Sequence, residues 1–195
     1  MSDFIALMTI MLWPAIPLFW IPVHGLSKIF RKLGLITYII PLFTWLPLAY
    51  LIFQKRDFIL QFRVEFPVVL NIIGVLLLAY GTLLHIWTGK LLGLWGLIGL
   101  PELSTKIKGR LVMEGPFSVV RHPTYLAHTL MFLGVFLLTE VTYVGVVTFL
   151  DLLIINILVI PLEEKELLSR FGDEYKIYRK KVPSRFFPWI RLQRS

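Results

Sequence analysis

Arg121-His122-Pro123-Thr124-Tyr125 is a short polar stretch in an otherwise apolar part of the chain. It lies between the turn Gly115-Pro116-Phe117 and a long apolar run, residues 124–138. A second polar stretch, Glu163-Glu164, follows another apolar run, residues 142–162, and only a very short link joins the two runs. Two membrane helices joined in this way form a hairpin, which brings both polar stretches to the same membrane face. We expect that face to hold the functional site.

The composition indicates an integral membrane protein. The chain has 195 residues, of which 57% are hydrophobic and 16% are charged, whereas a soluble domain of this length usually carries more charge. It has no cysteine, which excludes disulfides, a thiolate nucleophile, Cys-ligated zinc and iron–sulfur clusters. The net charge of +8 is explained better by where Lys and Arg lie relative to the membrane than by nucleic acid, and we expect no nucleic-acid partner.

Five apolar runs predict an all-α bundle of five transmembrane helices: residues 4–23, 35–53, 67–87, 124–138 and 142–162. About 20 residues are needed to cross the hydrocarbon layer, so the short fourth run predicts tilt or local thinning of the bilayer. The first run lacks the basic start and the cleavage site of a signal peptide, and its prolines predict a kinked helix. Residues 91–100 are apolar but too short to cross, which predicts a re-entrant or interfacial piece.

We expect one membrane domain, 1–195. It divides into three N-terminal spans (1–87), a cytoplasmic connection (88–123), a helical hairpin (124–162) and a cytoplasmic tail (163–195), with the catalytic region at 109–183.

The distribution of Lys and Arg predicts the orientation. If the N-terminus lies outside, all but three of the 20 Lys and Arg residues fall in cytoplasmic segments, and the exceptions are Lys55, Arg56 and Arg63. Positive residues concentrate on the cytoplasmic side of membrane proteins. We therefore predict an N-out, C-in, multi-pass protein with its active site on the cytoplasmic face. The membrane would be the cell membrane in a prokaryote or the endoplasmic reticulum in a eukaryote.

The tail 163–195 is amphipathic. Five apolar residues recur at helical spacings of 4, 4, 3 and 4: Leu167, Phe171, Tyr175, Tyr178 and Val182. The pair Gly172-Asp173 is suited to ending one helix and starting the next. Two roles fit this pattern: an interfacial helix held to anionic lipid by basic residues, and a lid that packs its aromatic stripe over a cofactor. Residues 186–189 are expected to form an interfacial aromatic anchor.

The two polar stretches carry complementary charges. Pro123 suits the first turn of a helix, and a helix N-terminus beside the guanidinium of Arg121 favours an anion. Glu163 and Glu164 end a span where the helix dipole favours cations, so they require partners or a ligand. A zwitterionic ligand with a ribose, such as S-adenosylmethionine, suits both ends. The alternative is that Arg121 and His122 only mark the cytoplasmic edge of a span.

Further polar residues lie within the spans. His85, His128 and Asn156 fall at a similar shallow depth, so they can line one pocket below the polar stretches. Helix–helix hydrogen bonding is an equally weighted alternative. Asp151 lies deeper, and we expect it to be protonated or paired within the bundle. We predict no metal site.

Four segments together resemble the isoprenylcysteine carboxyl methyltransferase family, which is grouped with membrane phospholipid methyltransferases. They are the Gly-Pro-Phe turn, the Arg-His-Pro-Thr-Tyr stretch, Glu163-Glu164-x-x-Leu167 and Phe171-Gly172-Asp173-Glu174-Tyr175-x-x-Tyr178. The resemblance implies methyl transfer from S-adenosylmethionine, which leaves S-adenosylhomocysteine, to the C-terminal carboxylate of a prenylated cysteine or a similar lipophilic carboxylate. The acceptor would enter from the lipid bilayer.

The resemblance also implies the site residues. The expected cofactor-binding residues are Gly109, Arg110, Leu111, Val112, Phe117, His122, Pro123, Thr124, Tyr125, Glu163 and Glu164. We expect Arg121 to be catalytic by orienting the acceptor carboxylate. The chain departs from the family at Ala127, where a glycine is common. It also lacks, within 156–162, the arginine with which eukaryotic members contact their substrate.

Three other functions remain open from the sequence. A phospholipid or small-lipid N-methyltransferase would share the cofactor site and would use His122 or Glu164 to remove a proton from the amine. A steroid- or lipid-reductase-like enzyme would require a nicotinamide site. A non-enzymatic scaffold or lipid-binding module would bind no cofactor. The chain has no Gly-rich nucleotide loop, which argues against a Rossmann methyltransferase. The sequence does not determine the oligomeric state.

Overall fold

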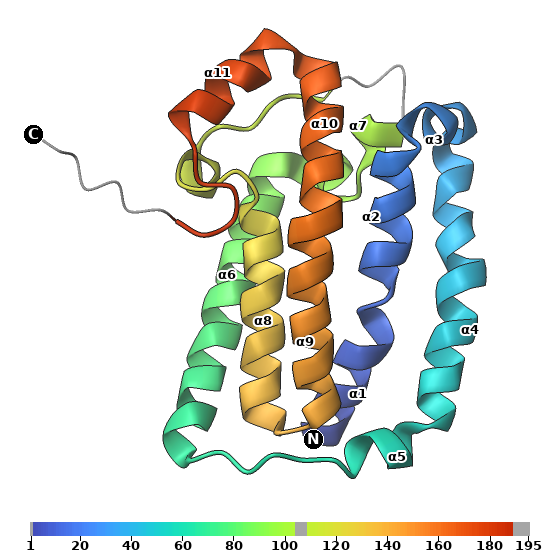
Figure 1. Ribbon diagram of the computed structural model, residues 1–195, viewed down its shortest axis with the longest axis vertical. Coiled ribbons are helices and arrows are strands. Elements are labelled where there is room, and N and C mark those ends of the chain that lie inside the picture. Colours follow the sequence, from blue (N-terminus) through green and yellow to red (C-terminus); the bar gives the residue numbers. More distant parts are fainter. Residues whose placement is uncertain (1, 104–108, 189–195) are drawn as a thin grey trace, which may run out of the picture.

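Apolar helices run roughly side by side along the long axis of the molecule (Figure 1). The computed structural model describes residues 2–103 and 109–188. Their helices are α1 Ser2–Leu12, α2 Ala15–Gly25, α3 Ser27–Leu33, η1 Gly34–Ile39, α4 Ile40–Gln54, α5 Arg56–Leu60, α6 Val68–Leu97, α7 Leu100–Leu103, η2 Gly115–Ser118, α8 Pro123–Thr139, α9 Thr142–Ile154, η3 Ile155–Val159, α10 Ile160–Phe171 and α11 Asp173–Lys181. The described residues contain no strand beyond a single bridge between Arg63 and Val141. The all-α prediction is confirmed.

Four helical stretches are long and apolar enough to cross a membrane: Ser2–Gly25, Ser27–Gln54, Val68–Leu103 and Thr142–Phe171. The fourth apolar run, 124–138, forms α8, which is shorter, with 17 residues. A multi-pass helical membrane protein is therefore confirmed, whereas five crossings and the N-out orientation stay predictions. The first stretch breaks between α1 and α2 at Trp13-Pro14, as its prolines predict.

The third stretch is longer than the sequence predicts. Residues 91–97 continue α6 instead of forming a separate piece, although Gly93 interrupts the helix with φ 70° and ψ 167°. Only glycine adopts such a backbone readily. The helix therefore bends beyond residue 93 and leads into α7 above the bundle (Figure 1). The pattern of apolar residues does not predict a local break at a single glycine.

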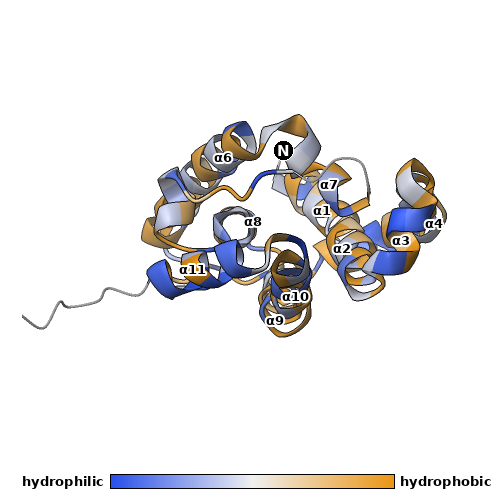
Figure 2. Ribbon diagram, turned by 90° about the horizontal axis from the view of Figure 1, so that it is seen from above, coloured by the Kyte–Doolittle hydropathy of each residue, from blue (hydrophilic) through white to orange (hydrophobic). Residues whose placement is uncertain are grey.

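Helix α8 lies between α6 and α9 when the bundle is viewed from above (Figure 2). Its contact with α6 depends on small residues. A Cβ on Gly134 would lie 2.6 Å from the Leu78 nitrogen, and one on Gly81 would lie 2.9 Å from the Ala127 carbonyl oxygen. The two backbones can approach this closely only because glycine and alanine occupy the crossing. Ala127, the departure from the family pattern, is fully buried there.

The core contains one deep polar pair. Asp151 is 1% exposed, and its Oδ1 accepts a hydrogen bond from Trp13 Nε1 at 2.9 Å. This pairing within the bundle confirms the prediction for Asp151. It links α9 to the break between α1 and α2, where Trp13 packs against the apolar cluster that includes Val144 and Val147.

The tail folds back over one end of the bundle. Gly172, with φ 56°, separates α10 from α11, and Asp173 is the first residue of α11, one position later than a cap. The aromatic stripe faces inward, because Tyr175, Tyr178 and Val182 are buried in one cluster with Leu111, Leu167, Leu168 and Phe171. The stripe packs on protein, as the lid requires, while contact of the basic residues with anionic lipid stays a prediction.

The predicted aromatic anchor at 186–189 is only partly present. Phe186 is buried at 3% exposure and packs with Tyr125 in the core, so its assignment to the interface is wrong. Phe187 is 60% exposed, and Trp189 lies outside the described residues. Phe186 is drawn inward because the preceding backbone pairs with residues 121 and 122, as described below.

Helices α3, α7 and α11 lie at one end of the bundle, and α5 lies at the other (Figure 1). The hydrophilic colouring is strong on α3 and α11, whereas much of the ribbon of the long helices has hydrophobic colouring (Figure 2). Helix α3, which contains Lys28, Arg31 and Lys32, and the tail 163–185 thus share the end that contains both polar stretches. This is the arrangement of positive charge that the orientation prediction requires.

Candidate functional site

A cavity of about 530 Å³ lies at that end, below α11 and between α6, α8 and α10. Ten of the predicted residues line it: Gly109, Arg110, Leu111, Val112, Phe117, Arg121, His122, Thr124, Tyr125 and Glu163. Pro123 is buried at the start of α8 and Glu164 points toward Arg121, and neither lines the cavity. The hairpin does bring the two polar stretches together.

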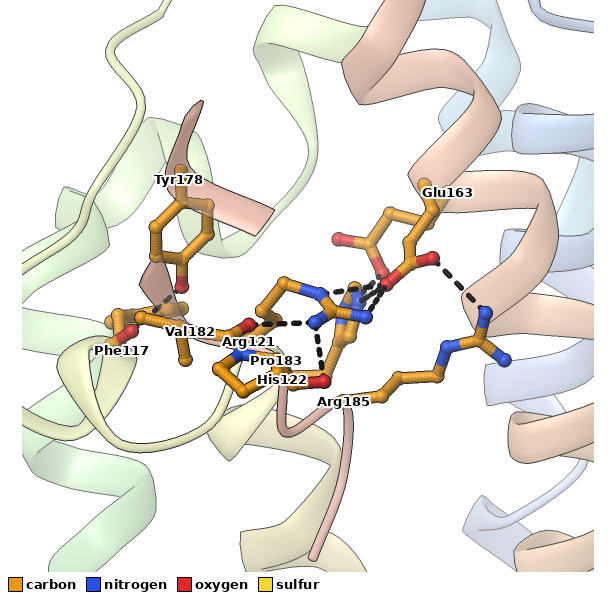
Figure 3. Close-up of polar contacts among 9 residues, drawn as sticks. Phe117, Arg121, His122, Glu163, Tyr178, Val182, Pro183 and Arg185 are labelled. Carbon is orange, nitrogen blue, oxygen red and sulfur yellow. Dashed lines mark hydrogen bonds and ion pairs between the residues drawn. The ribbon is translucent and has the colours of Figure 1, made fainter. Parts of the chain in front are cut away.

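Arg121 and Glu164 form a buried ion pair, with side chains 6% and 7% exposed. Arg121 Nε and Nη2 donate to Glu164 Oε1 at 2.9 and 2.7 Å. Nη1 donates to the carbonyl oxygens of Val182 and Pro183 at 2.6 and 2.8 Å (Figure 3). Arg185 also donates to Glu164 Oε2, at 3.1 Å. All three guanidinium nitrogens of Arg121 therefore donate hydrogen bonds to other groups of the protein.

Backbone hydrogen bonds also join the segment before α8 to the segment after α11. The nitrogens of Arg121 and His122 donate to the carbonyl oxygens of Ser184 and Arg185 at 3.0 and 3.1 Å. Tyr178 Oη donates to the carbonyl oxygen of Phe117 at 2.7 Å (Figure 3), and burial raises the pKa of Tyr178, so the hydroxyl keeps its proton for this bond. The segment after α11 is thereby fixed beside the start of α8.

His122 is the residue before α8, as predicted, and it lies between the two carboxylates. Its Nδ1 is 3.3 Å from Glu163 Oε2, and its Nε2 is 3.4 Å from Glu164 Oε1. Burial lowers the pKa of His122, but the charges and hydrogen bonds of Glu163 and Glu164 outweigh burial and hold the pKa above its ordinary value. We infer a cationic imidazolium that neutralises part of the acidic pair.

The comparisons with known proteins bear on this region. Residues 69–174 match the phospholipid methyltransferase family, a range that covers α6, α8, α9 and α10. The chain belongs to the phospholipid methyltransferase family. The match includes both polar stretches, from Arg121 to Glu164.

Three curated relatives are similar to this family member. The cobalt-zinc-cadmium resistance protein CzcN of Cupriavidus metallidurans is 34% identical over 121 residues, which cover 56% of this chain and 55% of that protein. Methanethiol S-methyltransferase 1 of Bradyrhizobium diazoefficiens is 34% identical over 102 residues, 49% of this chain and 34% of that enzyme. Protein-S-isoprenylcysteine O-methyltransferase of Schizosaccharomyces pombe is 36% identical over 81 residues, 38% of this chain and 31% of that enzyme.

The chain spans about half the length or less of each of these relatives. No solved structure is significantly similar to it. The relatives' names concern different acceptors, a thiol in one and a prenylated cysteine in another, so the family assignment does not determine what this member methylates.

Several buried polar atoms at the cavity make no hydrogen bond among the described residues. They are Glu163 Oε2, Glu102 Oε2, His85 Nδ1 and His128 Nδ1. Glu163 Oε2 is near His122 Nδ1, but the geometry of a hydrogen bond is not met. Unpaired buried carboxylate oxygens are unfavourable unless a ligand donates to them. Ribose hydroxyls and an ammonium group are suitable donors, so these residues fit S-adenosylmethionine.

The sequence analysis missed Glu102 and Arg170 as lining residues. Arg170 Nη2 donates to Glu102 Oε1 at 2.8 Å and lies 3.3 Å from Glu166 Oε2, while Arg31 Nη2 donates to Glu166 Oε1 at 2.5 Å. This network ties α3, α7 and α10 together. One signal was available, because Glu163, Glu166 and Arg170 recur at helical spacing and therefore share a face.

The polar residues predicted to line a pocket within the spans do not all reach the cavity. His85 and His128 line the cavity, as predicted, whereas Asn156 does not. Asn156 Nδ2 donates to the carbonyl oxygen of Leu152 at 2.8 Å within its own helix. It belongs to the π turn Ile155–Val159, and such a turn contains an extra residue, which shifts the faces on which neighbouring side chains lie. The regular helical spacing used for the prediction does not hold there.

Proposed function

We propose that this protein transfers a methyl group from S-adenosylmethionine to a lipophilic acceptor inside the cavity. The observation that carries the proposal is Glu163, which lines a 530 Å³ cavity and whose buried Oε2 lies 3.3 Å from His122 Nδ1 but makes no hydrogen bond among the described residues. S-adenosylmethionine would supply an electrophilic methyl group, and enzymes of this family generally use it. The cytoplasmic end of the bundle would admit it, since the positive loops gather there.

The chain's own residues would act by binding, orientation and exclusion of water. Glu163 would accept hydrogen bonds from the ligand, and His122, whose Nδ1 lies 3.3 Å from Glu163 Oε2, would help to position that carboxylate. The start of α8, with Thr124 and Tyr125 at the cavity wall, offers the unpaired N–H groups of a first helical turn to an anionic group. The buried stripe on α10 and α11 shields the cavity on one side, and a dry site strengthens each of these interactions.

The predicted acceptor is the carboxylate of a prenylated cysteine or a similar lipophilic acid. The family resemblance and the relative from Schizosaccharomyces pombe support this substrate class. Arg121 was expected to orient the carboxylate. Its nitrogens are instead bonded to Glu164 and to two carbonyl oxygens, so an acceptor carboxylate would have to displace one of these. We propose that Arg121 is a positioning residue that holds the site closed.

The test is transfer of labelled methyl from S-adenosylmethionine by the protein in liposomes, with a prenylcysteine analogue and phospholipid offered separately. Label released by base as methanol identifies a methyl ester and supports the carboxylate acceptor. Base-stable label in phospholipid identifies N-methylation at the same cofactor site. Binding of S-adenosylhomocysteine is measured in parallel by calorimetry. Absence of both binding and transfer would overturn the proposed function.

A further inference from the structure

The ion-pair network of Arg31, Glu102, Glu166 and Arg170 includes a guanidinium at the cavity wall that the proposed function does not use. Arg170 lies on α10 and lines the cavity, and its side chain is 8% exposed. Its Nη2 donates to Glu102 Oε1 at 2.8 Å and lies 3.3 Å from Glu166 Oε2. Nε and Nη1 make no hydrogen bond to a described residue, and Nη1, unlike Nε, is not fully buried. Arg170 therefore has a donor left for a ligand.

The two other arginines of the described lining are less suited to a ligand anion. Arg121 donates from all three guanidinium nitrogens to Glu164 and to two carbonyl oxygens. Arg110 pairs with Glu114, and its side chain is 68% exposed, so solvent screens its charge. Of these three arginines, Arg170 combines burial with an unbonded donor, and a guanidinium makes its strongest hydrogen bonds to charged acceptors such as a carboxylate.

Arg170 lies beside two of the residues expected to bind the cofactor. A Cβ built on Gly109 would be 3.8 Å from Arg170 Nη1, so this nitrogen is close to the wall formed by residues 109–112. Arg170 also follows Glu163 by seven residues, which is two turns and about 10 Å along α10, on the same face of the helix. Both side chains line the cavity. A ligand bound at Glu163 can therefore extend along α10 to Arg170.

The neighbouring carboxylate favours a zwitterionic ligand. Glu102 Oε1 is 2.8 Å from Arg170 Nη2, so a ligand that carries only a carboxylate would approach Arg170 against the negative charge of Glu102. An α-amino acid also carries an ammonium group, which that charge would attract. The network consists of two arginines and two glutamates, so its formal charges cancel, and a zwitterion adds no net charge to this buried region.

We propose that Arg170 binds the carboxylate of the amino-acid end of S-adenosylmethionine, while the charge of Glu102 stabilises the ammonium group of that end. This inference rests on the proposed function and assigns one end of the cofactor to residues that the sequence analysis missed. Glu163 is then left for the ribose hydroxyls. Arg31 and Glu166 would keep the guanidinium in place without contacting the ligand, since neither of them lines the cavity.

The experiment measures, by calorimetry on the full chain, the binding of S-adenosylhomocysteine and of methylthioadenosine, which keeps the nucleoside but lacks the amino-acid end. The variants are Arg170→Gln, Arg170→Lys and the control Arg31→Gln, which removes the other cation of the network but not a lining residue. We expect Arg170→Gln to weaken S-adenosylhomocysteine about tenfold or more and to leave methylthioadenosine unchanged. Arg170→Lys should restore part of the loss, since lysine keeps the charge but lacks the fork. The control should bind both ligands like the native protein.

A comparison within the native protein does not depend on how well a variant folds. The native protein should bind S-adenosylhomocysteine about tenfold or more tightly than methylthioadenosine. Equal affinities would overturn the inference and leave the proposed function standing. Equal losses of both ligands in Arg170→Gln, or the same loss of S-adenosylhomocysteine in Arg31→Gln, would also overturn it, because Arg170 would then act only through the network.

The acceptor is the other possible source of a carboxylate, and methyl transfer to dodecanoic acid and to dodecylamine in phosphatidylcholine liposomes separates the two. If Arg170→Gln binds S-adenosylhomocysteine like the native protein but loses transfer to the acid and not to the amine, Arg170 binds the acceptor and the inference is wrong. Absence of binding of either nucleoside, together with absence of all transfer, would overturn both the inference and the proposed function.

Discussion

Arg121 Nη2 lies 2.7 Å from Glu164 Oε1, and both side chains are almost fully buried. This pair joins the turn before α8 to the end of the long span Thr142–Phe171, and Arg121 also holds the carbonyl oxygens of residues 182 and 183. Three segments that are distant in sequence therefore meet at one guanidinium. Breaking a buried ion pair on one side leaves an uncompensated charge, which costs more than removing both partners.

Replacing Arg121 with Ala should therefore destabilise the protein by about 3–5 kcal/mol, and Arg121→Lys should rescue it only partly because lysine lacks the bidentate fork. Melting temperature in detergent measures the effect. The double variant Arg121→Met with Glu164→Met should be more stable than either single variant. Lys176→Ala, which removes an exposed ion pair on α11, is the matched control and should melt like the native protein.

The opposite outcome is informative about Arg121. If Arg121→Ala melts like the native protein and binds S-adenosylhomocysteine normally, yet fails to methylate only carboxylate acceptors, then Arg121 orients the acceptor. The positioning role would then be wrong.

Glu163→Gln should weaken binding of S-adenosylhomocysteine without unfolding the protein. The carboxylate has one buried oxygen with no hydrogen bond among the described residues, and a hydrogen bond to a charged group is worth about 1.5–3 kcal/mol. The dissociation constant should therefore rise more than tenfold, as measured by calorimetry. Glu174→Gln, an exposed acid on α11, should leave the dissociation constant unchanged. Native affinity in Glu163→Gln would contradict the assignment of this residue to the cofactor.

The imidazolium of His122 predicts a specific dependence of stability on pH. Since its pKa is raised in the folded protein by Glu163 and Glu164, despite burial, its stabilisation is fully present below about 6.5, the ordinary value. It is lost as pH rises through the folded pKa. The difference in melting temperature between the native protein and His122→Gln should therefore be largest in mild acid and should shrink in mild alkali. A difference that grows with pH would mean that His122 is neutral.

The sequence was sufficient to predict the helices and to predict which two polar stretches lie near the site. Apolar runs locate spans because the bilayer demands about 20 apolar residues, and the hairpin forces residues 121–125 and 163–164 to one end. The sequence could not reveal what each charge pairs with. Arg121 was assigned to the acceptor because a guanidinium beside a helix N-terminus attracts anions, but the anion that it contacts in the fold is Glu164, supplied by the chain itself.

Two structural details also escaped the sequence analysis. Residues 91–100 were predicted as a piece separate from the third span, because a glycine break inside one helix and a gap between two pieces have the same apolarity pattern. In the structure α6 continues to Leu97, and only Gly93 within it has non-helical backbone angles. Asn156 was assigned to the pocket by depth alone, whereas a π turn alters the face on which it lies. Depth along a helix is predictable from residue count, but direction around the helix requires an undistorted register.

The crossing of α6 and α8 gives a final prediction, because it sets the distance between two elements of the site. A Cβ at Gly134 would lie 2.6 Å from the backbone nitrogen of Leu78, a contact that only a backbone shift relieves. Gly134→Ala should cost about 1–3 kcal/mol, seen as a lower melting temperature. Gly89→Ala, whose Cβ would make an ordinary 3.5 Å contact with a Leu97 side chain, is the matched control and should not be destabilised. If Gly134→Ala melts no lower than Gly89→Ala, the helices are not held together by this close approach.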